Sequence, residues 1–294
     1  MQYWKRIGSV FVRFPVKKAE ITMLTTHVDL HGDRFAPEAL EGYAARVNAS
    51  YLPLMVEHDL RIPPIGRIAA ATVVELEDGE RAVRVTVEIF EGTDTEEMLS
   101  GDGREIPISR PGYEALGIEY DRSYQTKEGE EFLAGLRALS PDVKTVPIVK
   151  KALEPISTLT IAAGAFALGG IAAGFSGKIG EDLYLRLKAA LVKRFKRADK
   201  PRLLDFRFTV MRGEQTIEIH LLLENPSGEE IEALLSSGFG EIDVFLNRIN
   251  FAEYPIAKLF LRYDSRGLTL RYAVRRNCVP LLPLDEPPEN KDND

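Results

Sequence analysis

The chain has little of the chemistry that builds disulfide frameworks or metal centres. Among its 294 residues there are four histidines and one cysteine, Cys278. A single cysteine excludes an internal disulfide and agrees with a reducing compartment. The histidines and the cysteine show no spacing typical of metal ligands. The sequence therefore predicts neither a metal site nor a bound cofactor.

An excess of positive charge is also missing. The 38 Lys and Arg residues are outnumbered by 45 Asp and Glu residues, which gives a net charge of −7 and an isoelectric point near 5.4. Binding to nucleic-acid phosphates needs clustered, uncompensated Lys and Arg, so we expect no nucleic-acid partner. With 45% hydrophobic and 28% charged residues, the chain has the composition of a folded protein with room for two modest domains.

Residues 1–142 are predicted to form one β-rich α+β domain. Pro37 can open a helix, because its missing N–H would be unbonded there in any case, and Leu40, Tyr43, Ala44 and Val47 follow at helical spacing. Asp78-Gly79 is typical of a hairpin turn. Stretches in which apolar and polar residues alternate, or in which residues that favour β-strands are frequent, predict strands at 9–14, 20–26, 52–57, 68–77, 81–90, 113–124 and 131–139.

Three short motifs in this block carry a resemblance. They are Val28-Asp29-Leu30-His31-Gly32-Asp33, then Pro37-Glu38-Ala39-Leu40, then Val56-Glu57-His58-Asp59 followed by Pro64-Ile65-Gly66. In this order they resemble the N-terminal half of the phage prohead (capsid-maturation) serine proteases. The resemblance implies a prohead-protease-like domain in which His58 is the catalytic base.

The nucleophile that this family uses has no counterpart at the matching position. The family's strand typically reads Gly-Leu-Ser-Ile-Gly-Phe/Tyr, and the similar stretch here is Ala115-Leu116-Gly117-Ile118-Glu119-Tyr120, so Gly117 stands in place of the serine. Glycine has no side chain with which to attack a carbonyl carbon. The domain is then either non-catalytic or a peptidase that uses another serine. Ser123 is the nearest candidate, and Ser109 and Ser140 are weaker ones.

Other polar residues near these motifs have two interpretations each. His31, Asp33 and Asp59 are candidate binding residues, or they belong to polar turns that Gly32 makes possible. His58 itself could be a hydrogen-bonding residue at a strand end, whereas His220 lies in a strand pattern typical of packing. The acidic stretch 75–131 could attract a basic peptide or form a solvated surface.

Residues 143–200 contain the longest uncharged run. Residues 155–177 have no charge, which meets the length needed to cross a bilayer, and Gly170 with Gly174 would allow close helix packing. Residues 178–200 then carry eight Lys or Arg and three acids, a net of +5. We expect a membrane helix followed by a basic juxtamembrane helix on the cytoplasmic side. The alternatives are a buried Gly/Ala-rich helix in a homo-oligomer and an amphipathic helix without lipid contact.

Residues 201–283 are predicted to form a small α+β domain. The order is ββαββ, with strands at 204–211, 216–223, 256–263 and 268–274 and a helix after Asn225-Pro226-Ser227. Residues 284–294 are rich in Pro, Glu, Asp and Asn and are predicted to be a disordered tail.

These patterns together favour a membrane-associated bacterial or prophage protein of the α+β class. Its protease-like domain would recognise a protein or peptide ligand, with a phage component as one candidate and antiviral defence as one setting. One rival is a membrane-tethered serine peptidase with His58 as general base. The other is a soluble structural oligomer that packs through the Gly/Ala-rich helix.

Overall fold

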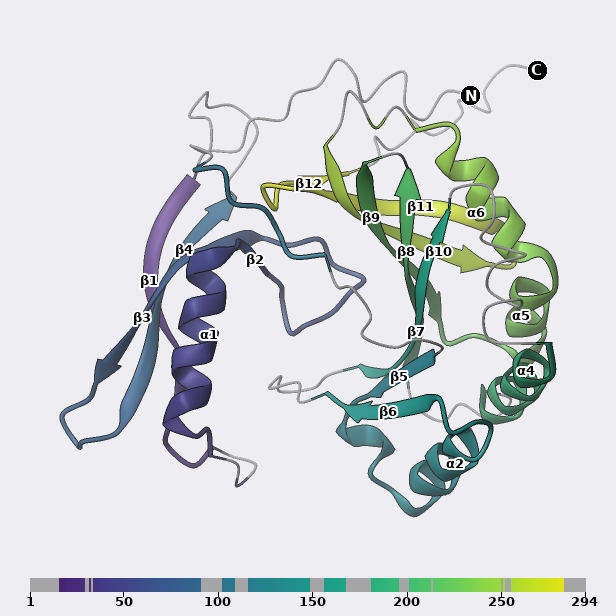
Figure 1. Cartoon of the computed structure of the whole chain (residues 1–294), viewed down its shortest axis with the longest axis horizontal. Helices are drawn as coiled ribbons and strands as arrows, with labels where there is room; N and C mark the ends of the chain where they lie inside the picture. Colours follow the sequence, from purple (N-terminus) through teal and green to yellow (C-terminus); the bar gives the residue numbers. More distant parts are fainter. Residues whose placement is uncertain are drawn as a thin grey trace, which may run out of the picture.

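A computed structural model describes residues 16–29, 32, 34–90, 102–108, 116–148, 156–167, 181–195, 201–212, 214–249, 251 and 255–282. These residues form an α+β structure with two β-sheets, one of four strands and one of eight. Figure 1 shows the smaller sheet with one helix on the left and the larger sheet with the remaining helices on the right.

The first sheet is antiparallel and has the order β1-β4-β3-β2. Helix α1 packs on it through the residues that its spacing predicted, and Pro37 occupies its first turn. Gly79 has a φ of +80° in the turn between β3 and β4, as the hairpin signal requires. The helix and the hairpin are thus confirmed. The elements are β1 (Val16–Thr25), α1 (Pro37–Ala49), β2 (Leu52–Leu54), β3 (Gly66–Glu75) and β4 (Arg81–Phe90).

The second sheet has the order β12-β11-β10-β9-β8-β7-β5-β6. Parallel pairs (β5 with β6, β7 with β8, β9 with β10) alternate with antiparallel neighbours (β5 with β7, β8 with β9, β10 with β11). Each parallel pair has helical residues between its strands in the sequence, because parallel neighbours need a crossover connection. The strands are β5 (Leu116–Tyr120), β6 (Val143–Pro147), β7 (Ser157–Ala167), β8 (Arg202–Arg212), β9 (Gln215–Glu224), β10 (Ile256–Asp264), β11 (Gly267–Arg275) and β12 (Pro280–Leu281).

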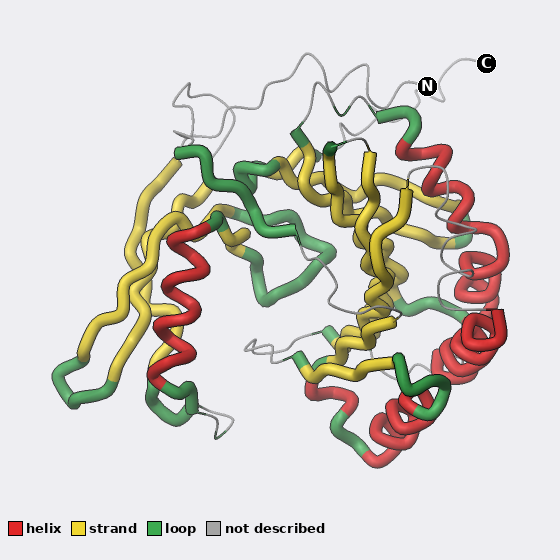
Figure 2. The backbone as a smooth tube through the Cα atoms, in the orientation of Figure 1, coloured by secondary structure: helices red, strands yellow, loops and turns green. Residues whose placement is uncertain are grey.

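The helices between these strands cover one face of the second sheet (Figures 1 and 2). They are α2 (Lys127–Arg137), α4 (Glu181–Phe195), α5 (Gly228–Ala233) and α6 (Phe239–Leu246), with a 3-10 turn at Arg122–Tyr124 and a π-helical turn at Leu234–Gly238. Thr126 caps α2, and Ser227 with Glu230 forms a capping box on α5. The apolar faces of these helices are buried in the main core against the strands. The opposite face of the sheet is left for other contacts.

Part of that opposite face contacts the first sheet and the loop that follows β2. A small core joins them, in which Tyr51 packs with Tyr272 and Cys278. Arg67, 2% exposed, forms an ion pair of 2.6 Å with Glu88 and donates to the carbonyl oxygen of Asn277. The ion pair lies within the first sheet, between β3 and β4, whereas the hydrogen bond to Asn277 links that sheet to the turn that follows β11.

Two expected elements are wrong. Residues 157–167, predicted as the first half of an apolar helix, form the strand β7. Nearly all of the described side chains of β7 are buried, and its sequence is an almost continuous apolar run. Hydrophobic periodicity cannot distinguish such a strand from a buried helix. Residues 127–137, which overlap the expected strand at 131–139, form helix α2. The expected strand at 9–14, the pair Gly170 and Gly174, and the tail 284–294 lie outside the described residues.

The sheets divide the chain differently from the expected blocks. The expected boundaries at 142/143 and 200/201 fall inside the eight-stranded sheet, whereas the change of sheet lies between Phe90 and Leu116. The basic helix exists as α4, but its apolar residues Leu187, Leu191 and Phe195 are buried in the core. Its charges also form ion pairs, including Lys188–Glu232 and Arg194–Glu128. Within the described ranges, no helix has both the length and the apolar character needed to cross a membrane.

Candidate functional site

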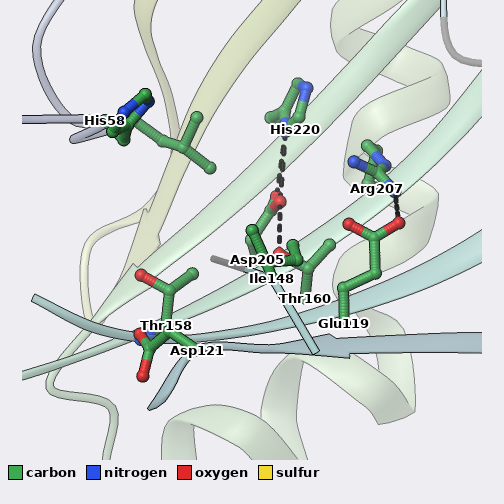
Figure 3. A pocket seen from close by; sticks show the side chains of 10 residues that line it. His58, Glu119, Asp121, Ile148, Thr158, Thr160, Asp205, Arg207 and His220 are labelled. Atoms are coloured by element: carbon green, nitrogen blue, oxygen red, sulfur yellow. Dashed lines mark hydrogen bonds and ion pairs between the residues drawn. The ribbon is translucent and has the colours of Figure 1, made fainter. Parts of the chain in front are cut away.

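A cavity of about 180 Å³ lies on the face of the second sheet that the helices leave uncovered (Figure 3). Strands β5, β7, β8 and β9 supply most of its wall, and the loop between β2 and β3 supplies His58 and Leu60. Eight of its ten lining residues are polar or charged, and the other two are Leu60 and Ile148. The lining residues are His58, Leu60, Glu119, Asp121, Ile148, Thr158, Thr160, Asp205, Arg207 and His220.

The strand register explains why these side chains converge. Successive side chains of a strand point to opposite faces, and directly paired residues of neighbouring strands share a face. Glu119, Thr160 and Asp205 are paired in one row across β5, β7 and β8. Arg207 and His220 are paired in the adjacent row across β8 and β9. The polar positions of four strands therefore meet at one place.

His220 is buried and lies between two carboxylates. Its Nδ1 is 3.1 Å from Asp205 Oδ2, and its Nε2 is 2.7 Å from Glu218 Oε1. Burial alone would lower the pKa of His220, but Asp205 and Glu218 outweigh it and raise the pKa above its usual value. As an imidazolium, His220 uses both ring N–H groups and has no lone pair to accept a proton. We therefore assign it a structural role and not that of a general base.

The charge of Glu218 is balanced from a second side. Lys258 Nζ lies 2.7 Å from the same Oε1 atom that contacts His220. Burial would raise the pKa of Glu218, but His220 and Lys258 hold it well below its usual range. The His220 ring also stacks on Phe260, with centroids 4.5 Å apart and planes 4° apart. Ion pairing and stacking together hold the ring in one orientation.

Arg207 and Glu119 form an ion pair at the side of the cavity (Figure 3). Burial lowers the pKa of Arg207, but Glu119 and the nearby carboxylates of Asp205 and Glu218 raise it by more. Arg207 therefore stays charged beside Glu119. Glu119 and Asp205, two of the three acids that line the cavity, each have a cationic partner.

Asp121, the third acid, is held by neutral groups. Its Oδ1 accepts from the backbone N–H of Ser123 at 2.9 Å and from the Ser123 hydroxyl at 2.5 Å. Its Oδ2 accepts from the backbone N–H of Thr158. Asp121 is 3% exposed and forms no ion pair with a Lys, Arg or His of the described chain. It is thus a buried carboxylate at a cavity, stabilised by hydrogen bonds alone.

The loop that carries His58 has an unusual backbone. Glu57 and His58 are consecutive non-glycine residues with φ values of 50° and 56°, a left-handed conformation that costs free energy for L-residues. Contacts with the second sheet hold the next residues: Tyr272 Oη donates to the Leu60 carbonyl oxygen at 2.9 Å, and Arg271 Nε donates to that of Arg61 at 2.5 Å. The exposed His58 is thereby placed at the cavity.

The residues expected to form the site are only partly brought together. His58 lines the cavity, and Gly117 lies on the cavity face of β5, two residues before Glu119. The Ser123 hydroxyl donates a hydrogen bond to Asp121, and its oxygen lies 2.5 Å from the hydroxyl oxygen of Ser157. Ser123 is not among the residues that line the cavity. Asp59 forms an ion pair of 2.7 Å with Arg61. Burial would raise the pKa of Asp59, but its hydrogen bonds and charge interaction with Arg61 lower the pKa by more.

Four other residues were expected near the site. His31, Asp33 and Ser109 lie outside the described residues. Ser140 accepts from the backbone N–H of Asp142 in the turn before β6.

The strand residues of the cavity were not predicted from the sequence. Asp205, Arg207, Glu218 and His220 occupy alternate positions of apolar strands, and His220 was taken as a packing residue. Charged side chains at alternate positions of otherwise apolar strands were the available signal, because Asp, Glu, Lys and Arg are rarely buried without a partner. In the described part of the chain, no group of His, Cys, Asp or Glu could hold a metal ion.

No family model, curated protein or solved structure matches this chain. The similarity of residues 28–66 to prohead proteases therefore stays a prediction.

Proposed function

We propose that this protein is a recognition module that binds a cationic group, such as a basic side chain of a peptide, in the cavity beside Asp121. The observation that carries the proposal is the place of Asp121, a buried carboxyl group that lines the cavity. A buried carboxylate is costly unless it is paired, and here only neutral donors from Ser123 and Thr158 hold it. A cation that enters the cavity would pair with this charge.

The other charges support a cation and oppose an anion. Glu119 is paired with Arg207, and Asp205 is paired with His220. Arg207 and His220 are thus paired with acids, whereas Asp121 has no cationic partner among the described residues. The volume of about 180 Å³ also suits one side chain, since a cavity of about 150 Å³ admits a benzene molecule.

The test compares blocked peptides, acetyl-Gly-X-Gly-amide, with Lys, Arg or norleucine at X. Ligand-observed NMR titration of the full chain should show tighter binding of at least one basic peptide than of the norleucine peptide. Asp121→Asn should weaken that binding by about tenfold or more, because a hydrogen bond to a charged group contributes about 1.5–3 kcal/mol. Asp142→Asn, at an exposed turn, removes the same charge elsewhere and should leave binding unchanged. Equal binding of all three peptides would refute the proposal.

A second candidate is hydrolysis by a serine nucleophile. It is favoured by His58, which lines the same cavity as Asp121, and by Ser123, which is bonded to that carboxylate. Serine chemistry needs a hydroxyl within hydrogen-bond reach of its base, whereas the hydroxyl of Ser123 contacts Asp121 and Ser157. Recognition is therefore the function that the geometry supports better.

A fluorophosphonate probe distinguishes the two functions. Under the recognition proposal, mass spectrometry finds no probe on Ser123 in the wild-type chain. Labelling of Ser123 that disappears in His58→Ala, but persists in a Ser265→Ala control at the exposed β10–β11 turn, would establish the hydrolytic alternative.

A further inference from the structure

We infer that the cavity selects a primary ammonium group, such as the lysine side chain, over the guanidinium group of arginine. This inference rests on the proposed function and specifies its ligand. It follows from how many hydrogen bonds each oxygen of Asp121 already accepts.

A carboxylate offers about four acceptor positions, two on each oxygen. On Asp121, Oδ1 accepts from both the backbone N–H and the hydroxyl of Ser123, so its two positions are filled. Oδ2 accepts only from the backbone N–H of Thr158, which leaves one position. The carboxylate can therefore take one further donor, and only at Oδ2.

Arginine and lysine differ in how they would use that position. Arginine binds a carboxylate best through two parallel N–H groups, one to each oxygen. The filled Oδ1 atom excludes this arrangement. An ammonium group is a compact charge with three donors that can bond to separate acceptors, so one open position on Oδ2 suits it.

The surrounding wall suits an ammonium group on an aliphatic chain. Thr160 Oγ1 donates to Asp205 Oδ2 at 3.1 Å, so its hydroxyl oxygen retains acceptor capacity for a second N–H. Thr160 follows Thr158 on the same face of β7, and both line the cavity with Asp121. Leu60 and Ile148 supply apolar surface in the same wall, against which a methylene chain can pack.

The decisive experiment changes the number of free hydrogen-bond acceptor positions on Asp121 without removing its carboxylate. Ser123→Ala deletes the hydroxyl donor and opens one position on Oδ1, so that both oxygens can accept from a guanidinium. Ser123 is exposed and does not line the cavity, so the wall keeps its shape. The acetyl-Gly-X-Gly-amide peptides with Lys, Arg and norleucine are titrated into the wild-type chain, Ser123→Ala and the control Ser265→Ala.

The wild-type chain and Ser265→Ala should bind the Lys peptide about tenfold more tightly than the Arg peptide, the difference expected for one charge-assisted hydrogen bond. In Ser123→Ala this preference should fall to about parity through tighter binding of the Arg peptide. Arg binding equal to Lys binding in the wild type, or a preference unchanged by Ser123→Ala, would overturn the inference while leaving the proposed function in place. Failure of both basic peptides to exceed norleucine would overturn the proposed function as well.

Discussion

The buried cluster around His220 makes a strong prediction about stability. His220→Phe keeps a flat ring that can stack on Phe260 but removes the charge and both N–H donors. Asp205 and Glu218, each 1% exposed, then lose a cationic partner, although Thr160 still donates to Asp205 and Lys258 still pairs with Glu218. Breaking a buried ion pair costs about 3–5 kcal/mol. We expect a loss of that size from a total stability of about 5–15 kcal/mol.

The loss should depend on pH with a defined sign. The pKa of His220 is raised in the folded chain, and that of an unfolded histidine is about 6.5. Protonation of His220 therefore contributes its full amount to the free energy of unfolding below about pH 6.5. This contribution is lost as the pH rises through the pKa of His220 in the folded chain. The difference in stability between the wild-type chain and His220→Phe should be largest near pH 6 and smaller at higher pH.

Urea unfolding between pH 6 and 9 measures this difference. A matched control is His27→Phe, because His27 also contacts a carboxylate at 2.7 Å, that of Asp78, but both side chains are largely exposed. It should change the unfolding free energy little at any pH. A loss below about 1 kcal/mol for His220→Phe, or one that grows with pH, would refute the assignment of His220 as a buried imidazolium.

Three further predictions concern single positions. Gly66→Ala should destabilise the chain by about 1–3 kcal/mol in urea unfolding, because a Cβ there would overlap the backbone oxygen of Glu88, and a neutral result would contradict this packing. Ser227→Ala removes the capping box with Glu230 and should cost about 1 kcal/mol in the same assay; no loss would mean that the cap contributes nothing. Burial raises the pKa of Cys278 to about 12, so Ellman's reagent at pH 8 should react with it only after unfolding, and fast labelling of the folded chain would contradict its burial.

The sequence predicts those elements whose signals are local. The Asp78-Gly79 turn, the helix that starts at Pro37 and the helix capped at Ser227 were all expected and are present, since each depends on residues within a few positions of one another. The ββαββ order of residues 201–283 was also expected and is found in β8 to β11. Local patterns failed at β7, which lies between β5 and β8 inside the sheet, because burial of its side chains on both faces removes the alternation that marks a strand.

The cavity could be predicted only in part, because it depends on register between distant segments. His58 was found through a resemblance, and it lines the cavity. Asp121, Asp205 and His220 come from three separate elements, and nothing local in the sequence states that β7 pairs with both β5 and β8. Without that pairing, a charged residue in a strand cannot be assigned to a particular neighbour.

The contacts that hold the loop over the cavity have a consequence for synthesis of the chain. The side chains of Arg271 and Tyr272 donate hydrogen bonds to the carbonyl oxygens of Arg61 and Leu60, across sequence separations of 210 and 212 residues. A ribosome that adds about 5–20 residues per second needs roughly 10–40 s to cover that separation. During this interval the loop that carries His58 has been made but β11, which secures it, has not. The nascent chain therefore completes these contacts of the His58 loop only after β11 has emerged, late in translation.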